Sequence, residues 1–280
     1  MTSIEHNLTN HELEGLQRAL LEMLIEVDRI CKKHEIRYVL FAGTLLGAVR
    51  HGGFIPWDDD LDIAMMRDEY IRFRQACAQD LDKSRFFFQD NITDQHYRWG
   101  YGRVLRLDTE FSRIGQGHMR MQKGIFLDIF PMDGVPEFAP FRGVHNFICF
   151  ILRKLLYAEA GRKTGNSILI RLWYAIINII PHNWIFAMMS KLTKFSIRSK
   201  YVRHIAFPTP KGRIYAFLRE WFEDIIYIEF EGRLFPGIKD YHAFLFNHYG
   251  DYMQIPPPEK RHTHPVSKFK LPASFSEDLN

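Results

Sequence analysis

Cysteine is scarce in this chain, which carries only Cys31, Cys77 and Cys149 among its 280 residues. Three is too few, and an odd number, for a disulfide framework, and no Cys-x-x-Cys pair suggests a zinc site. The first eleven residues are polar and contain no apolar core of a signal peptide. We therefore expect a cytoplasmic protein with reduced thiols.

Long uninterrupted apolar runs are also missing. The longest apolar stretch, residues 168–189, is interrupted by Arg171, Asn178, Pro181 and His182. A helix that spans a membrane needs about 20 mostly apolar residues. No spanning helix is predicted.

Acidic residues are rare in the middle of the chain. Between Pro136 and Trp221 there are fourteen Lys or Arg and three acids, a balance of +11 within a chain of net charge +4. This asymmetry indicates an anionic partner. No recognition motif accompanies the charge, so nucleic acid is not expected. Peripheral contact with an anionic membrane, on its inner face, and an ordinary helical subdomain with a basic solvent face both remain open.

The composition, 46% hydrophobic and 25% charged, is that of a globular protein. A capping box from Thr9 to Glu12 opens an amphipathic helix at residues 10–34, and a second helix at 44–49 ends at Gly52. Asp68 is expected to cap a third helix. Strands are expected at residues 36–41, 61–65, 85–89, 101–107 and 125–129.

This order predicts an α+β fold, a mixed β-sheet flanked by helices. We expect a catalytic core at residues 1–140. A basic, almost wholly helical insertion is expected at 141–222, and a C-terminal segment at 223–280 is expected to pack back on the core.

An acidic segment, Trp-Asp-Asp-Asp-Leu-Asp-Ile at residues 57–63, carries the candidate chemistry. On a strand, residues two apart share a face, so Asp60 and Asp62 point the same way. Leu61 and Ile63 then point into the core. Two carboxylates so close repel each other unless a cation lies between them. Mg²⁺ or Mn²⁺ prefers such hard oxygen ligands together with phosphate.

Three alternatives compete for this segment. A run of charges can be a solvated loop. An EF-hand requires glycine at its sixth position, where this chain has Ile63. A glycosyltransferase Asp-x-Asp also binds a metal–diphosphate. The upstream turn at Gly43 and Thr44 opens a short helix and offers N–H groups to phosphate. A Gly-hydroxyl turn followed by Asp-x-Asp at a strand is typical of nucleotidyltransferase-like sites.

Three blocks, in order, resemble the LicD family of bacterial phosphocholine transferases, which are related to the fukutin-type proteins. The first is GTLLGAVRHGGFIPWDDDLDIAM at residues 43–65, and the second is FLDIFPMDG at residues 126–134. The third is weaker and comprises FEG at 230–232, YGDYM at 249–253, the prolines at 256–257, Lys260, Arg261 and His264.

The resemblance implies that Asp60 and Asp62 are metal ligands and that Asp128 is a third metal carboxylate or a general base. A buried structural role is the alternative for Asp128. Asp58 and Asp59 are either supporting or solvated acids. The resemblance also gives candidate substrate-binding residues, each with a structural or surface role as its alternative: Gly43, Thr44, Arg50, His51, Arg103 and His264.

The function implied is metal-dependent transfer of a phospho-substituent from a CDP-activated donor. Phosphocholine from CDP-choline is the expected group. The acceptor would be a sugar hydroxyl of a cell-surface glycan such as lipopolysaccharide, teichoic acid or capsule, free or lipid-linked. Two alternatives are nucleotidyl transfer to a small-molecule or sugar hydroxyl, and a non-catalytic adaptor at the membrane surface.

Overall fold

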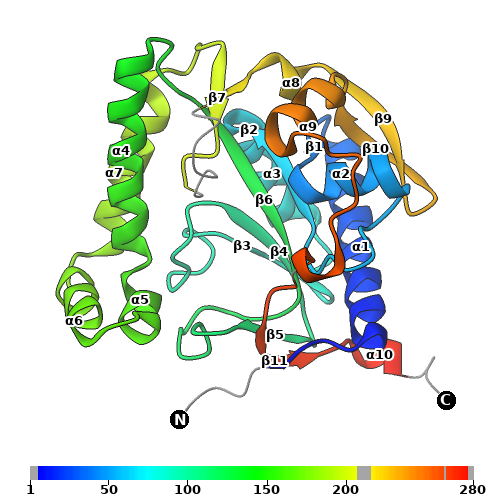
Figure 1. The fold of residues 1–280 in the computed structure, drawn as a ribbon, viewed down its shortest axis with the longest axis horizontal. Coiled ribbons are helices and arrows are strands. Elements are labelled where there is room, and N and C mark those ends of the chain that lie inside the picture. Colours follow the sequence, from blue (N-terminus) through cyan, green and yellow to red (C-terminus); the bar gives the residue numbers. More distant parts are fainter. Residues whose placement is uncertain (1–5, 207–215, 262, 277–280) are drawn as a thin grey trace.

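The structure is a computed structural model that describes residues 6–206, 216–261 and 263–276. Figure 1 shows the arrangement of its elements. In chain order they are α1 (Asn10–Lys33), β1 (Val39–Leu40), α2 (Ala42–His51), β2 (Asp62–Met66), α3 (Arg67–Asp80), β3 (Phe86–Gln89), β4 (Gly102–Arg106), β5 (Glu110–Arg113), β6 (Phe126–Gly134), α4 (Ala139–Leu156), α5 (Ala158–Thr164), α6 (Ile168–Ile177), α7 (His182–Phe195), β7 (Tyr201–Arg203), β8 (Phe217–Leu218), α8 (Glu220–Glu223), β9 (Ile225–Phe230), β10 (Arg233–Ile238), α9 (Tyr241–Tyr249), the 3₁₀ turn η1 (Pro258–Lys260), β11 (Val266–Lys270) and α10 (Ala273–Ser276).

The main sheet is mixed and has the strand order β1-β2-β6-β4-β3. Strands β2 and β6 are parallel, whereas β1, β4 and β3 run antiparallel to their neighbours. The far end of β6 pairs with β7, which in turn pairs with β8. The expected α+β class with a mixed sheet is confirmed.

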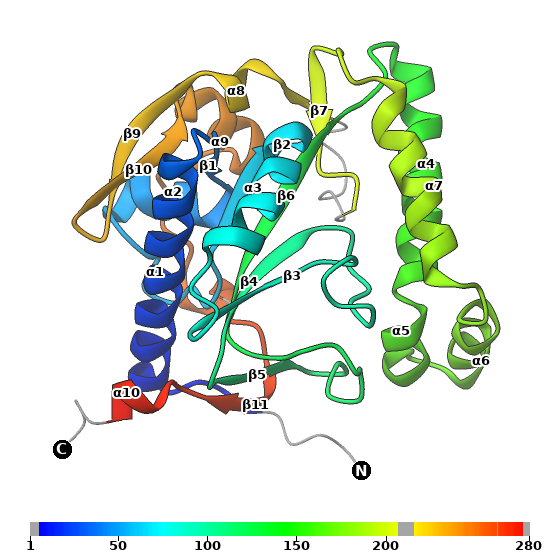
Figure 2. The same ribbon diagram turned by 180° about the vertical axis from the view of Figure 1, so that it is seen from behind.

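Helices α1 and α3 cover one face of this sheet, the face turned toward the viewer in Figure 2. The predicted capping box holds the start of α1. Thr9 donates its backbone N–H to the Glu12 carboxylate at 2.8 Å, and Glu12 donates its own N–H to the Thr9 hydroxyl at 3.2 Å. Apolar residues at helical spacing bury one side of α1 completely, as Leu20 and Leu24 illustrate.

Two local predictions need correction. The segment 36–41 forms only the two-residue strand β1, because the chain turns into α2 directly after Leu40. Asp68 does not cap α3: the cap residue is Met66, and Asp68 lies in the first turn. A carboxylate there still favours the helix, because it faces the positive end of the helix dipole.

Residues 139–195 form the four helices α4 to α7. Figures 1 and 2 show α4 and α7 side by side at one edge of the molecule, with α5 and α6 at their foot. A hydrophobic cluster separate from the main core, including Cys149, Ile185 and Met189, joins α4 to α7. Strands β7 and β8, inside the segment expected to be helical, extend the main sheet. The proposed boundaries at 140 and 222 stay predictions.

No single helix among the described residues is long and apolar enough to cross a membrane. Helices α6 and α7 meet that standard only as a pair, and the chain bends by 79° between them.

The C-terminal segment contacts the first motif block through Glu231. Phe54 donates its N–H to Glu231 Oε1 at 2.9 Å, and Glu231 donates its N–H to the Gly52 carbonyl at the same distance. A Cβ at Gly53 would lie 2.1 Å from Glu231 Oε1, so a larger residue there would have to displace the Glu231 carboxylate from this contact. Further along, β11 pairs with β5.

Candidate active site

The turn between β1 and α2 holds the start of β2. Thr44 is buried, and its hydroxyl accepts the backbone N–H of Asp62 at 2.8 Å. A Cβ at Gly43 would lie 3.1 Å from Asp58 Oδ2, so glycine lets that carboxylate approach the turn closely. Ala42 has a φ of 47°, a backbone conformation that residues other than glycine rarely adopt. Gly43 and Thr44 thus position the acidic segment; phosphate binding by this turn stays a prediction.

The acidic segment and β6 bring four carboxylates together. Asp62 and Asp128 are direct neighbours in the register of the parallel strands β2 and β6. Burial raises the pKa of Asp58 to about 8, assisted by the charges of Asp60 and Asp59. Burial, followed by the charges of Asp60 and Asp128, raises the pKa of Asp62 well above its usual range. The fold therefore holds Asp58 and Asp62 where burial, and then the charge of neighbouring acids, disfavours their ionised forms.

This donor set fits a hard divalent cation. The oxygens of Asp60 and Asp62 are half-buried, and burial raises the pKa of Asp60 as well. A cation between them would remove the repulsion and keep them ionised, which is the condition for oxygen ligation of Mg²⁺ or Mn²⁺. The identity of the ion stays a prediction.

Asp128 forms a buried ion pair with Arg103. Arg103 Nε donates to Asp128 Oδ1 at 2.6 Å, and the two side chains are 4% and 5% exposed. The guanidinium also lies 3.7 Å from the centroid of the Phe126 ring. The alternative of a surface role for Arg103 is therefore wrong, because its side chain is buried. Its expected contact with donor phosphate stays a prediction.

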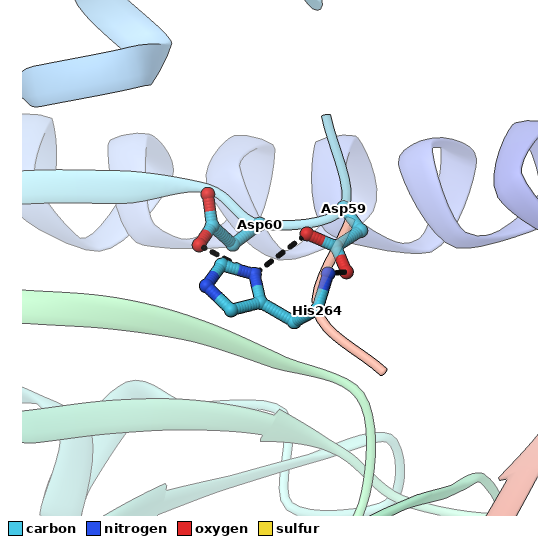
Figure 3. A group of neighbouring side chains, drawn as sticks. All are labelled: Asp59, Asp60 and His264. Atoms are coloured by element: carbon cyan, nitrogen blue, oxygen red, sulfur yellow. Dashed lines mark hydrogen bonds and ion pairs between the residues drawn. The ribbon is translucent and has the colours of Figure 1, made fainter. Parts of the chain in front are cut away.

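Asp59 and His264 connect the acidic segment to the C-terminal segment (Figure 3). His264 donates its backbone N–H to Asp59 Oδ2 at 2.6 Å and its Nδ1–H to Asp59 Oδ1 at 2.8 Å. The Asp59 side chain is 1% exposed, so it is a buried acid and not a solvated one. The same imidazole nitrogen lies 3.6 Å from Asp60 Oδ2.

Within the described ranges, Asp59, Asp60 and His264 bring ligand atoms within 4.8 Å of one another, a spacing that could hold a metal ion. Both oxygens of Asp59, however, already accept hydrogen bonds from His264. We interpret the Asp59–His264 pair as a clamp that holds the acidic loop. Of the three residues, Asp60 is then the one whose carboxylate can bind an ion. Asp62 and Asp128 lie outside this close set, so the expected ligand trio of Asp60, Asp62 and Asp128 stays a prediction.

Arg50 is also engaged with the C-terminal segment. It donates to the Tyr252 carbonyl at 2.8 Å and to His51 Nε2 at 3.0 Å. Burial lowers the pKa of both Arg50 and His51, and for His51 the Arg50 charge adds to the effect. These contacts give the two residues a structural role; their expected phosphate binding stays a prediction.

Two residues near the carboxylates escaped the sequence analysis. Arg113 lies 3.5 Å from Asp60 Oδ2. Burial is the main cause that raises the pKa of Tyr249, and the nearby charges of Asp62 and Asp58 raise it further. Tyr249 begins the YGDYM part of the third motif block, but that resemblance gave it no role, and Arg113 has no local sequence signal; both reach the site through the tertiary fold.

Comparison with known proteins identifies the family. The model for the LicD/FKTN/FKRP nucleotidyltransferase domain matches residues 35–146, which include the acidic segment and β6. Lipopolysaccharide cholinephosphotransferase LicD of Haemophilus influenzae is 31% identical over 273 residues, or 91% of this chain and 97% of the relative. The chain belongs to the LicD family. It is therefore an enzyme, a transferase.

A second relative matches a shorter part of the chain. Ribitol 5-phosphate transferase FKRP of Homo sapiens is 29% identical over 116 residues, which cover 40% of this chain and 23% of the relative.

Beside the carboxylates of this LicD-family enzyme lies a cavity of about 350 Å³ between β4 and the C-terminal half of helix α4. Arg103 and Arg113, the partners of Asp128 and Asp60, line it together with Arg98, Trp99 and Tyr157. Within the part of the chain that the structure describes, Arg98 Nη1, Trp99 Nε1 and Arg113 Nε have no hydrogen-bond acceptor. The arginine side chains in the cavity wall are N–H donors, which suit an acceptor-rich ligand.

The clamp in this LicD-family enzyme gives a stability prediction. His264→Ala is expected to lower the free energy of unfolding by about 1–3 kcal/mol, because it leaves one oxygen of the buried Asp59 without its partner. Urea unfolding monitored by circular dichroism measures the change. His11→Ala, at an exposed position in the first turn of α1, is the control and is expected to change it by less than about 0.5 kcal/mol. Equal effects for both variants would contradict the clamp.

Proposed function

We propose that this chain transfers phosphocholine from CDP-choline to a hydroxyl group of a cell-surface glycan. The match to a lipopolysaccharide cholinephosphotransferase along nearly its whole length supports the choline donor. The partial match to a ribitol 5-phosphate transferase supports the more general reaction, transfer of a phospho-substituent.

One observation carries the proposal: the crowded carboxylates adjoin a basic cavity. Asp62 and Asp128 face each other across β2 and β6, and the arginines that pair with Asp60 and Asp128 also line the cavity. A cavity of about 350 Å³ lies within the size range, about 300–1,000 Å³, of small-molecule sites. Its arginine side chains suit the phosphate oxygens of a nucleotide-activated donor.

In this proposal Asp60 and Asp62 hold the divalent ion. When bound, the ion would polarise the phosphoryl group and neutralise charge that develops on its oxygens. Arg113 would bind donor phosphate at the mouth of the cavity. Asp128 would contribute its negative charge to the site, where the ion pair with Arg103 holds its carboxylate in place.

The test uses purified protein with Mg²⁺, a lipopolysaccharide-type glycan and one donor at a time: CDP-choline, CDP-glycerol or CDP-ribitol. Release of CMP, matched by a mass increase of the glycan, is the expected result. Turnover with one of the other two donors alone would correct the head group. Absence of turnover with all three would overturn the donor class.

Nucleotidyl transfer is the second candidate, because the matching family model describes a nucleotidyltransferase domain. That reaction attacks the phosphorus of the nucleotide itself and releases pyrophosphate from a nucleoside triphosphate. Pyrophosphate release from CTP, without CMP release from a CDP donor, would favour it.

A further inference from the structure

The helices α4 and α6 expose an unusual amount of apolar surface. On α4, Phe141, Val144 and Phe147 are 64%, 59% and 62% exposed. On α6, of its ten residues Tyr174 alone is buried, while Leu169 and Ile176 are 74% and 66% exposed. A helix that is apolar on nearly all sides is normally covered by protein or lipid.

The position of α6 shows that the main core of this protein does not cover it. In both views α6 lies at the outer edge of the molecule, at the foot of α4 and α7 (Figures 1 and 2). The exposed apolar residues of α6 therefore lie at the outer edge of the molecule, close to the foot of α4.

The charge around this surface is almost entirely positive. Glu159 is the single acid between residues 139 and 206, and Arg98 neutralises it at 2.9 Å. Lys191 and Lys194 on α7 and Arg198 shortly after it are exposed. Two copies of such a surface repel each other, which disfavours self-association, whereas an anionic surface attracts it.

We propose that α4, α6 and α7 form a docking surface for an anionic lipid bilayer. The 79° bend between α6 and α7 makes an interfacial position suitable and a spanning one unsuitable. Leu169, Trp173 and Ile176 insert at the level of the headgroups, where the amphipathic indole ring is favoured. The exposed Lys and Arg contact lipid phosphates.

This surface adjoins the cavity of the candidate active site. Phe150 of α4 is 45% exposed and also lines the cavity, as does Lys154 one turn further on. A bilayer under α4 would therefore bring a lipid-linked acceptor to the mouth of the cavity. The docking itself goes beyond the proposed function and does not depend on which donor is used.

The first experiment measures flotation of the full-length protein with vesicles of phosphatidylcholine alone or with 30% phosphatidylglycerol (about one anionic lipid in three), at low and high salt. We expect binding to the anionic vesicles that weakens at high salt. A triple variant, Leu169→Ser/Trp173→Ser/Ile176→Ser, is expected to bind about 100-fold more weakly, because each side chain loses its apolar insertion. Ile92→Ser, which removes an equally exposed isoleucine outside this surface, is the matched control and is expected to bind like the wild type.

A second set separates charge from apolar insertion. Lys191→Gln/Lys194→Gln/Arg198→Gln is expected to bind anionic vesicles about 100-fold more weakly, since each residue contributes roughly 1 kcal/mol of attraction. Vesicles containing brominated lipid are expected to quench less fluorescence in Trp173→Phe than in the wild type, because Trp173 lies in the interface. This conservative variant keeps the ring and hence the fold.

Three results would overturn the proposal. The wild type fails to float with anionic vesicles, the triple variant floats as well as Ile92→Ser, or the wild type is a dimer by light scattering that the triple variant converts to monomer. CMP release with a soluble glycan is expected to be unchanged in the triple variant, so loss of docking and loss of the proposed activity are distinguishable.

Discussion

Asp62→Asn is expected to reduce CMP release by at least about 10³-fold while leaving the fold intact. The neutral amide cannot balance a divalent cation, and loss of one preorganised charge at a phosphoryl-transfer site costs on the order of 10²–10³ or more in rate. Asp62 faces Asp60 and Asp128, so neither neighbour can replace it without a change in the strand register.

The same substitution is expected to raise the free energy of unfolding in metal-free buffer. The pKa of Asp62 is raised in the fold, so the folded state disfavours the ionised form that the unfolded chain carries at neutral pH. Such a group costs stability above its unfolded pKa, and the amide removes that cost. Differential scanning calorimetry in the presence of EDTA measures the change.

Asp68→Asn provides the matched control, because Asp68 is an exposed carboxylate six residues away in the first turn of α3. It is expected to keep wild-type turnover. If Asp62→Asn retained more than a tenth of the activity, Asp62 would have no part in the chemistry. A large loss of stability in Asp62→Asn would instead assign it a structural role.

Local patterns in the sequence predicted much of the fold. The capping box at Thr9 and Glu12 forms as expected, and Gly52 ends α2 in a left-handed conformation. Leu61 and Ile63 are both fully buried, which fixes the register that brings Asp62 beside Asp128. These features depend on residues a few positions apart, where periodicity and caps decide the structure.

The remainder of the site depends on distant contacts that no local pattern encodes. Asp59 reads as one more acid in a charged run, yet its partner His264 is 205 positions away. The sequence also offers no reason to select Arg113 among its many basic residues, since the pairing with Asp60 depends on how β5 lies in the tertiary fold. The apolar exposure of α6 was equally hidden, because composition alone does not distinguish a covered helix from an exposed one.

Arg103→Met is expected to lower the free energy of unfolding by about 3–5 kcal/mol. The substitution keeps the length of the side chain but leaves the buried Asp128 carboxylate without its partner. Urea unfolding measures the loss. Lys32→Met, which breaks the ion pair of an exposed lysine with Asp28 at 2.7 Å, is the control and is expected to cost less than about 1 kcal/mol.

The double variant Arg103→Met/Asp128→Leu separates the two roles open to Asp128. Removal of both charges is expected to restore most of the lost stability, because an apolar pair of similar volume needs no compensation for a buried charge. Activity, measured as CMP release, is expected to remain at least about 10³-fold below wild type, because the site still lacks a carboxylate beside Asp62. A double variant that is both stable and active would show that Asp128 only balances Arg103. A stable but inactive one would show that the Arg103–Asp128 pair is required for the chemistry itself, since the restored stability excludes a folding defect as the cause.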